Sequence, residues 1–319
     1  MIYAEAQKGS LPENHDALEV EKDNLISAAE LAFTRNKWES VGTIAAICGL
    51  PVTGVLSVRG FWDEAMKLNE RALQAAQISK QLDWVARFSF HKGGLHGKRG
   101  EWSEARQSYA QSLEIYKNLG HERQVGMVLN NLANIAQQTG EQAEARRLHL
   151  QSLEIKRRTK DRAGIAAAVH NLAMLAFDAG DLKEARALLE ESLNIEKELG
   201  NQHGIAASLH ELSVLAKDEG DFKQARNLLS ESLVITRRMR NKLLEAINLA
   251  QLALLDAAEG DLADAMKHSK QAEEIMVQLG NPENVSRITK QRAKFETQLR
   301  EQGTGKRDEL SDDSGNQQQ

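Results

Sequence analysis

The side chains best suited to chemistry in this sequence are imidazoles and amides that recur 40 residues apart. His170 and His210 have this spacing, and so do Asn131 and Asn171. Two histidines on successive helices could bind a metal ion or respond to pH, although partly exposed histidines without a ligand are the simpler interpretation. An asparagine side chain carries hydrogen-bond donors and an acceptor, so it can pair with the backbone of an extended peptide. The alternative is that these amides bond to neighbouring helices or to water.

The sequence contains no recognisable catalytic constellation. The motifs HExxH, GxSxG and CxxC are absent, and the carboxylates are scattered at helical spacing, mostly beside Lys or Arg. The segment KGGLHGKRG at 92–100 comes nearest to a phosphate-binding loop, but it lacks the glycine spacing and the Ser or Thr after Lys98. We therefore expect a protein that is not an enzyme and that binds no cofactor and no metal.

Composition favours a helical protein and excludes several classes of partner. Of 319 residues, 41% are hydrophobic, only 4% are aromatic and three are proline. The net charge of −5 includes no strongly basic field, which argues against a nucleic-acid partner. Cys48 is the single cysteine, which fits a reducing compartment. The N-terminus does not resemble a signal peptide, and no stretch approaches the ~20 apolar residues that span a bilayer. We expect a cytoplasmic protein without a membrane partner.

Glycines mark the sequence at a constant spacing of 40 residues. They are Gly60, Gly100, Gly140, Gly180, Gly220 and Gly260. An alanine follows each glycine after five residues, as at Ala145, and an alanine or serine follows after twelve, as at Ser152. Before each of four of them, apolar residues recur in register at i, i+3, i+4 and i+7, which indicates an amphipathic helix. Each unit therefore consists of a helix A, a glycine turn, a helix B and a linker.

Each part of this unit has a physical cause. A glycine lets the chain turn sharply after helix A. Acidic residues such as Asp181 and Asp221 suit the positive N-terminal end of helix B. The small residues seven positions apart lie on one face and allow a neighbouring helix to approach closely. Because neither helix can bury its apolar face alone, successive units must stack.

The glycine, the alanine and the small residue at these offsets resemble the tetratricopeptide repeat. The unit of 40 residues, longer than the usual ~34, is similar to the variant in kinesin light chains and in spindle adaptors with Leu-Gly-Asn repeats, and LNNLANIAQQTG at 129–140 is very close to it. The resemblance implies an all-α, right-handed superhelical solenoid of antiparallel helix pairs. It also implies a scaffold or adaptor for a protein or peptide partner. The first A helix departs from the pattern, because Gly93, Gly94 and Gly97 predict a weaker or bent helix.

The repeat and its flanks divide the chain into five segments. We expect a flexible N-terminus at 1–16, a divergent N-terminal helical pair at 17–60, the repeat array at 61–281, a capping helix at 282–301 and a disordered tail at 302–319. The tail is polar and cannot bury enough apolar surface to offset the entropy of ordering it.

Residues 17–59 also resemble the segment that follows the nucleotide-binding domain in bacterial signal-transducing ATPases of the STAND and NB-ARC type. The match consists of Glu21, Asn24 and Leu25 at the start of a helix. It implies an alternative function, in which the chain is a ligand-sensing or protein-sensing arm, or a fragment, of such a regulator. A nucleotide-binding domain upstream in a longer parent chain would distinguish this function from that of a free-standing adaptor.

In tetratricopeptide repeats the A helices line the concave side, so the resemblance places the partner-binding residues ten, nine, six and two positions before each glycine. The predicted set is Asn130, Asn131, Asn134, Gln138, His170, Asn171, Met174, Asp178, His210, Glu211, Val214, Gln251 and Leu254. The middle of this surface is rich in amides and imidazoles, and its C-terminal end is apolar. His91, nine positions before Gly100, is predicted to lie at the N-terminal end of this surface. Thirteen positions before the glycines only Arg87 is basic, so we expect no clamp for a C-terminal carboxylate.

Overall fold

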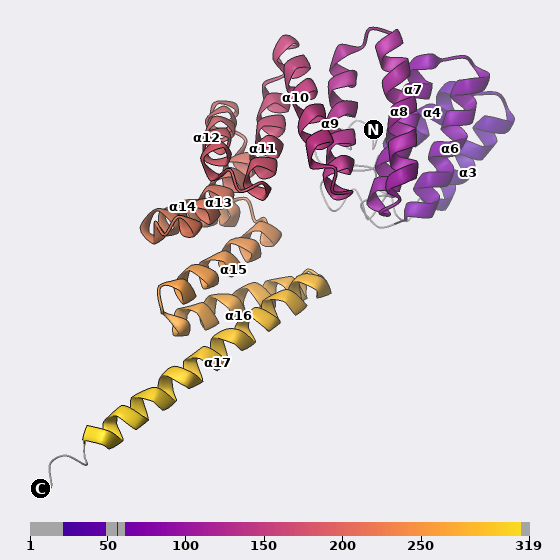
Figure 1. The fold of residues 1–319 in the computed structure, drawn as a ribbon. Coiled ribbons are helices and arrows are strands. Elements are labelled where there is room, and N and C mark those ends of the chain that lie inside the picture. The colour runs from indigo at the N-terminus through magenta and orange to yellow at the C-terminus, as the bar shows by residue number, and fades with distance from the viewer. Residues whose placement is uncertain (1–21, 49–55, 57–60, 314–319) are drawn as a thin grey trace, which may run out of the picture. The chain divides into compact units, whose positions relative to one another are not determined.

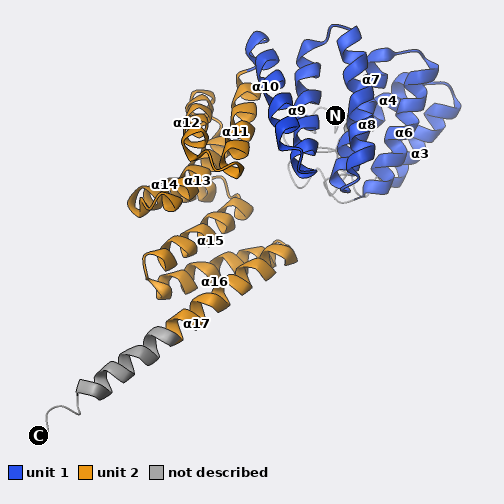
Figure 2. Ribbon diagram, viewed as in Figure 1, with its two compact units in different colours: residues 1–161 blue, residues 162–319 orange. Residues whose placement is uncertain are grey.

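The computed structural model describes residues 22–48, 56 and 61–313. In these residues the chain forms fourteen helices and no strand, which confirms the predicted all-α fold. The chain divides into two compact units, residues 1–161 and 162–319 (Figure 2). The glycine spacing continues across this division without a change of register, so the sequence pattern carries no sign of it.

The first unit consists of seven described helices, which pack side by side with their neighbours in sequence (Figure 1). They are α3 (Lys22–Thr34), α4 (Trp38–Cys48), α6 (Trp62–Ile78), α7 (Leu82–Lys98), α8 (Trp102–Asn118), α9 (Glu122–Gln138) and α10 (Gln142–Arg158). The A helices are α7 and α9, and each forms an antiparallel pair with the B helix that follows it. Helices α3 and α4 pack against α6 and lie in the segment where we expected a divergent helical pair. Residues 1–21, 49–55 and 57–60, which include the predicted turn at Gly60, lie outside the described residues.

The second unit repeats the same arrangement. Its helices are α11 (Arg162–Asp178), α12 (Leu182–Leu199), α13 (Gln202–Asp218), α14 (Phe222–Arg238), α15 (Lys242–Ala258), α16 (Leu262–Gln278) and α17 (Pro282–Asp313). Helices α11, α13 and α15 are A helices, each paired with the B helix that follows it, and α17 packs against α16 (Figure 1).

Helix α17 extends further than the sequence led us to expect. We predicted a capping helix at 282–301 and disorder from 302, whereas the helix continues to Asp313 and only residues 314–319 of the tail lie outside the described residues. Once a helix is nucleated, each further residue adds a hydrogen bond without a new nucleation cost. The helix thus continues through Gly303 and Gly305, which disfavour it, so local propensity does not explain its length.

The glycines that end the A helices have the left-handed backbone conformation that the repeat predicted. Their φ angles are 75° at Gly100, 81° at Gly140, 79° at Gly180, 82° at Gly220 and 88° at Gly260. The turns from helix B to the next helix A use the same conformation with mixed residues. Glycine occupies three of them, Gly120, Gly200 and Gly280, and these alternate with Lys80, Lys160 and Arg240, whose φ angles are all 55°.

Short polar side chains cap helices α12 to α17 of the second unit, whereas α7 to α10 of the first unit have no side-chain cap. Asp181, Asp221 and Asp261 each accept a hydrogen bond from the backbone N–H three residues later, as predicted for the start of helix B. Asn201, Asn241 and Asn281 do the same for helices α13, α15 and α17. A cap of this kind stabilises a helix by about 1 kcal/mol.

The small residues of the repeat lie where the two helices of one unit cross. The alanine five residues after the glycine is fully buried, as at Ala145 and Ala185. The serine at the second position also donates a hydrogen bond from Oγ to a backbone carbonyl of the paired A helix. These bonds run from Ser152 to Gly126 at 2.8 Å, from Ser192 to Ala166 at 3.2 Å and from Ser232 to Ala206 at 2.9 Å. The site thus needs a side chain that is small and, in these three repeats, also a donor.

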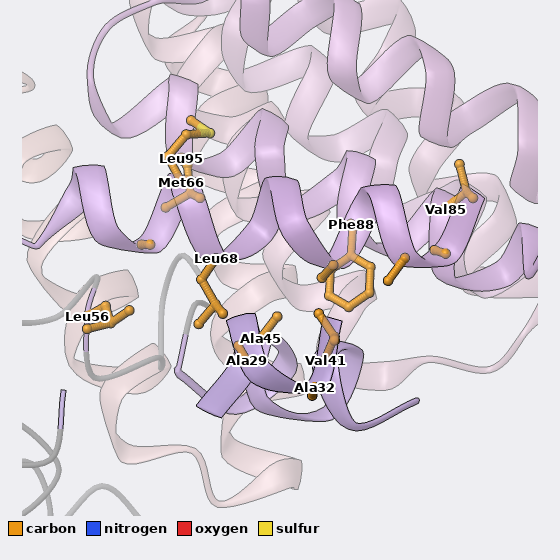
Figure 3. Close-up of a cluster of buried hydrophobic side chains, with 14 residues drawn as sticks. Ala29, Ala32, Val41, Ala45, Leu56, Met66, Leu68, Val85, Phe88 and Leu95 are labelled. Atoms are coloured by element: carbon orange, nitrogen blue, oxygen red, sulfur yellow. The ribbon is translucent and has the colours of Figure 1, made fainter. Parts of the chain in front are cut away.

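The core of the first unit joins the N-terminal helices to the first repeat. Phe88 of α7 and Leu68 of α6 point toward Val41 and Ala45 of α4 and Ala29 of α3 (Figure 3). All five side chains are buried. This packing covers the apolar side of α6, which would otherwise face water at the end of the repeat array.

Helix α7 runs without interruption despite the glycines that predicted a weaker or bent helix. A Cβ atom at Gly93 would lie 2.8 Å from the aromatic ring of Tyr109 on α8, closer than carbon atoms can pack. Gly93 therefore makes room for Tyr109. At Gly97 no atom lies within 4 Å of the Cβ position, so that glycine has no packing role.

His149 of α10 is a polar residue at a core position. Its side chain is fully buried, and neither ring nitrogen has a hydrogen-bond partner among the described residues. The equivalent residues one and two repeats later are Leu189 and Leu229. Burial, and secondly the charge of Lys156, lower the pKa of His149 from 6.5 to about 4, because a buried imidazolium loses its hydration.

Two alanine substitutions test the role of the turn glycines, because the same change should have opposite signs at two positions. Gly140→Ala should lower the free energy of unfolding by about 1–2 kcal/mol, since alanine disfavours a positive φ. Gly97→Ala should raise it by about 0.5–1 kcal/mol, since alanine is the better residue inside a helix. Urea denaturation followed by circular dichroism measures both, and equal effects at the two positions would contradict the assignment.

His149→Leu tests the buried imidazole. Between pH 6.5 and about 4 the unfolded chain binds a proton at this residue that the folded chain does not, so stability falls as the pH falls, by up to about 1.4 kcal/mol per pH unit. The leucine variant should lose this part of the pH dependence and should be more stable at pH 7 by about 1–3 kcal/mol, because two unpaired nitrogens are removed. Denaturation midpoints measured across this pH range would show parallel curves for the two proteins if the idea is wrong.

Candidate partner-binding surface

Four of the predicted binding residues lie on α9 in the first unit. Asn134 and Gln138 are exposed, whereas Asn130 and Asn131 are half-buried. The Nδ2 atom of Asn131 donates to the carbonyl of Met127 in its own helix at 2.9 Å, and Lys156 Nζ donates to Asn130 Oδ1 at 3.4 Å. Both amides are therefore partly engaged within the unit, which is the alternative that the sequence left open.

His91 does not lie where the count from the glycines predicted. Its side chain is buried on α7, and its ring packs edge-on against Phe88 and Phe90, with centroid distances of 5.8 and 6.2 Å. Burial, together with the charge of Arg87, lowers its pKa to about 3. The aromatic neighbours turn this position into core, so His91 presents no polar group to a partner.

The other nine predicted residues lie on three A helices of the second unit. They are His170, Asn171, Met174 and Asp178 on α11, His210, Glu211 and Val214 on α13, and Gln251 and Leu254 on α15. All nine are half-buried or exposed, whereas Leu172, Leu212 and Leu252 beside them are buried. The carboxylate of Glu211 is close enough to influence His170, and α13 contacts α15 directly, so the three helices share one face. We call these nine residues the A-helix face.

The A-helix face ends in a row of exposed apolar side chains on α15. Leu243 and Leu254 are 43% and 39% exposed, and Ile247 between them is half-buried. The three residues stand four and seven positions apart, which places them on one side of the helix. Leu243 and Ile247 were not in the predicted set, because residue type alone does not distinguish them from the buried leucines of the same helix.

A hydrogen-bonded chain holds one residue of the A-helix face in place. Asn248 of α15 is buried; its Oδ1 atom lies 2.8 Å from His210 Nδ1, and its Nδ2 atom donates to Ser232 Oγ at 2.7 Å. Because Oδ1 can only accept, Nδ1 of His210 carries the proton in this arrangement. Ser232 in turn donates to the carbonyl of Ala206, so this series of hydrogen bonds links α13, α14 and α15. Sequence reasoning missed Asn248, whose signal was an amide at a position that is Val128 and Ala168 in earlier repeats.

His170 and His210 are not joined in a metal site. In the part of the chain that the structure describes, no three His, Cys, Asp or Glu side chains come together in a way that could hold a metal ion. Burial lowers the pKa of His170, and the carboxylates of Glu211 and Glu196 oppose this shift. Nor is any described helix both long and apolar enough to cross a membrane.

Helix α17 continues the register of the A helices. Its buried residues Ile288 and Phe295 stand 40 positions after Asn248 and Leu255, which are buried in α15. Phe295 also packs in one cluster with Ala253 of α15. The exposed side of α17 therefore matches, in register, the side of α15 that carries the apolar row. From the sequence we expected this helix only as a cap, and the series of turn glycines ends before it, since position 300 is Arg300.

A tetratricopeptide repeat family model matches residues 84–158 and 164–238. Each match covers two of the helix pairs, α7 to α10 in the first unit and α11 to α14 in the second. A search of curated proteins finds no match.

Solved structures with the same fold include proteins of several kinds. BtubC (BKLC) from P. vanneervenii is 21% identical with a TM-score of 0.57, and the alignment covers 69% of this chain and 92% of that one. A Rap protein complexed with competence and sporulation factor is 15% identical with a TM-score of 0.57, over 93% and 94% of the two chains. The Rap conjugation gene regulator of plasmid pLS20, solved with the Phr* peptide, is 13% identical with a TM-score of 0.60, over 84% and 78%.

The family match, the glycine turns with left-handed backbone and the paired A and B helices agree with one another. At these identities the solved structures add the fold alone, and they agree with it too. The chain thus carries tetratricopeptide repeats, which the family model identifies over residues 84–158 and 164–238.

Proposed function

We propose that this protein is a non-enzymatic scaffold or adaptor that binds a segment of a partner protein on the A-helix face of its second unit. The observation that carries the proposal is the exposed apolar row Leu243, Ile247 and Leu254, next to half-buried Val214. The other leucines of α13 and α15 show that these helices bury apolar side chains wherever the fold allows. Covering an exposed leucine would stabilise a complex by up to about 2 kcal/mol.

Polar groups of the same face suit a peptide backbone. Asn171 and Gln251 bring amides to α11 and α15, and an amide can both donate to and accept from an extended chain. Two similar structures were solved with ligands, a Rap protein with competence and sporulation factor and a Rap regulator with the Phr* peptide. These proteins share the fold at 15% and 13% identity, so they support a peptide as the class of partner without indicating its sequence.

The sensor arm of a signalling ATPase is the alternative function. Of the residues that suggested it, Glu21 lies outside the described residues, and Asn24 and Leu25 lie in α3. Leu25 packs against the first core cluster, which gives it a structural role in either case. The two functions differ in one respect that can be observed, because the arm requires a nucleotide-binding domain in the parent chain or a partner that supplies one.

Selection from a random peptide library with the full chain as bait tests the proposal. The peptides should be about 12 residues long, enough for an extended chain to cross four helices about 10 Å apart. Enriched peptides should bind the double variant Leu243→Glu, Leu254→Glu about tenfold or more weakly than the native chain, since the charges interrupt the apolar row. Fluorescence anisotropy of the labelled peptides measures the affinity.

The matched control is Val234→Glu with Val277→Glu, which places the same charges on the B helices α14 and α16, where these valines are 57% and 60% exposed. This variant should bind the peptides as the native chain does. A loss of affinity in the control and not in the α15 variant would move the binding surface to the B helices. A library that yields no enriched peptide would contradict the proposed function.

A further inference from the structure

We propose that the partner segment carries acidic residues beside its apolar residues, and that Arg287, Lys290 and Lys294 of α17 bind their carboxylates. This inference rests on the proposed function and specifies the chemistry of the partner. The three cations are exposed and extend the A-helix face beyond the apolar row of α15.

The register of the repeat places Arg287 and Lys294 on the side of α17 that matches the apolar row of α15, whereas Lys290 matches the buried Ala250. Lys294 stands 40 positions after Leu254, and Arg287 stands 40 positions after Ile247. Because Ile288 and Phe295 are buried at the positions that match Asn248 and Leu255, α17 and α15 turn the same sides to the core. Helices α15 and α17 share core clusters through Ile288 and Phe295, so their matching sides face the same way within the second unit, where α15, α16 and α17 follow one another (Figure 1).

Internal ion pairs do not account for these charges. Arg292, on another side of α17, pairs with Glu273 of α16 and approaches Glu296 at 3.8 Å. Lys290 and Lys294, in contrast, form no ion pair with any described residue, and Arg287 bonds only to the side-chain Oδ1 of Asn284 in its own helix, at 3.1 Å. Helix α17 thus carries one cation that is paired with a carboxylate on its packed side, Arg292, and three cations that face solvent.

Helix stability does not account for them either. The three cations stand at positions i, i+3 and i+7, where like charges on a helix repel one another. Isolated α17 would be more stable without this arrangement, and a partner with carboxylates would relieve the repulsion.

The nature of the neighbouring surface favours a protein segment over other anions. A nucleic acid or an anionic membrane surface would be bound by a broad basic field, but the chain has a net charge of −5 and the adjoining face carries Glu211, Asp178 and exposed leucines. An extended peptide can place apolar side chains on α15 and acidic ones on α17. If these helices are about 10 Å apart, the two kinds of residue stand about three positions apart in the partner.

The peptides enriched in the library selection test this inference. They should contain Asp or Glu about three positions from an apolar residue, and replacing those acids by Asn or Gln should weaken binding about tenfold. The variant Lys290→Glu, Lys294→Glu should weaken binding of the acidic peptides by at least as much, and Lys290→Arg, Lys294→Arg should preserve it. Raising the salt concentration should reduce the difference between acidic and neutral peptides.

The charge control is Lys183→Glu with Lys223→Glu, which makes the same charge change at exposed lysines near the starts of α12 and α14. It should leave affinity unchanged, and circular dichroism should show the same helix content in all variants. Enriched peptides without acidic residues, bound equally by the α17 variant, would overturn this inference and leave the proposed function standing. Binding of a single-stranded DNA oligonucleotide or of phosphatidylserine vesicles that requires Lys290 and Lys294, with no acidic peptide selected, would also overturn it. No enriched peptide at all would overturn both.

Discussion

The close approach of helix A and helix B within each repeat is the contact on which the rest of the structure depends. It occurs at residues without bulk, such as Ala185 and Ser192, and in three repeats a serine hydroxyl donates to a carbonyl of the paired helix. A larger side chain at these positions would separate the helices and expose the apolar residues around them, at a cost of about 1–3 kcal/mol. Because this contact engages one side of helix A, the opposite side stays open to solvent, and the A-helix face lies there.

Polar groups buried beneath the solvent-exposed side of the A helices hold its side chains in fixed orientations. Asn248 is buried, and it fixes the tautomer and orientation of His210 through one hydrogen bond and links to Ser232 through another. In the first unit Lys156 holds the acceptor of Asn130 in a comparable way. A surface whose side chains are held from below loses less conformational freedom when a partner binds, so more of the contact energy remains for affinity.

The sequence was sufficient to predict the features that depend on local chemistry. The turn glycines, the Asp caps at 181, 221 and 261 and the buried alanines follow from backbone geometry and helix termini, which short segments determine. The sequence was insufficient where the role of a residue depends on which side chains of the folded protein pack against it. Gly93 is explained only by the ring of Tyr109, and His91 became core because Phe88 and Phe90 surround it. The extent of α17 was missed for another reason, because composition describes what a segment can bury and not whether a helix already formed will continue through it.

The alternation of residues at the turns that lead from helix B to helix A has a mechanical consequence. Gly120, Gly200 and Gly280 adopt the left-handed conformation freely, whereas Lys80, Lys160 and Arg240 adopt it with a strain of about 1 kcal/mol or more. Strained turns and unstrained glycine turns thus alternate along the chain, and the glycine turns recur every 80 residues. A change of backbone angle at a glycine turn therefore costs little, whereas the same change at Lys80, Lys160 or Arg240 releases the strain that the left-handed conformation stores.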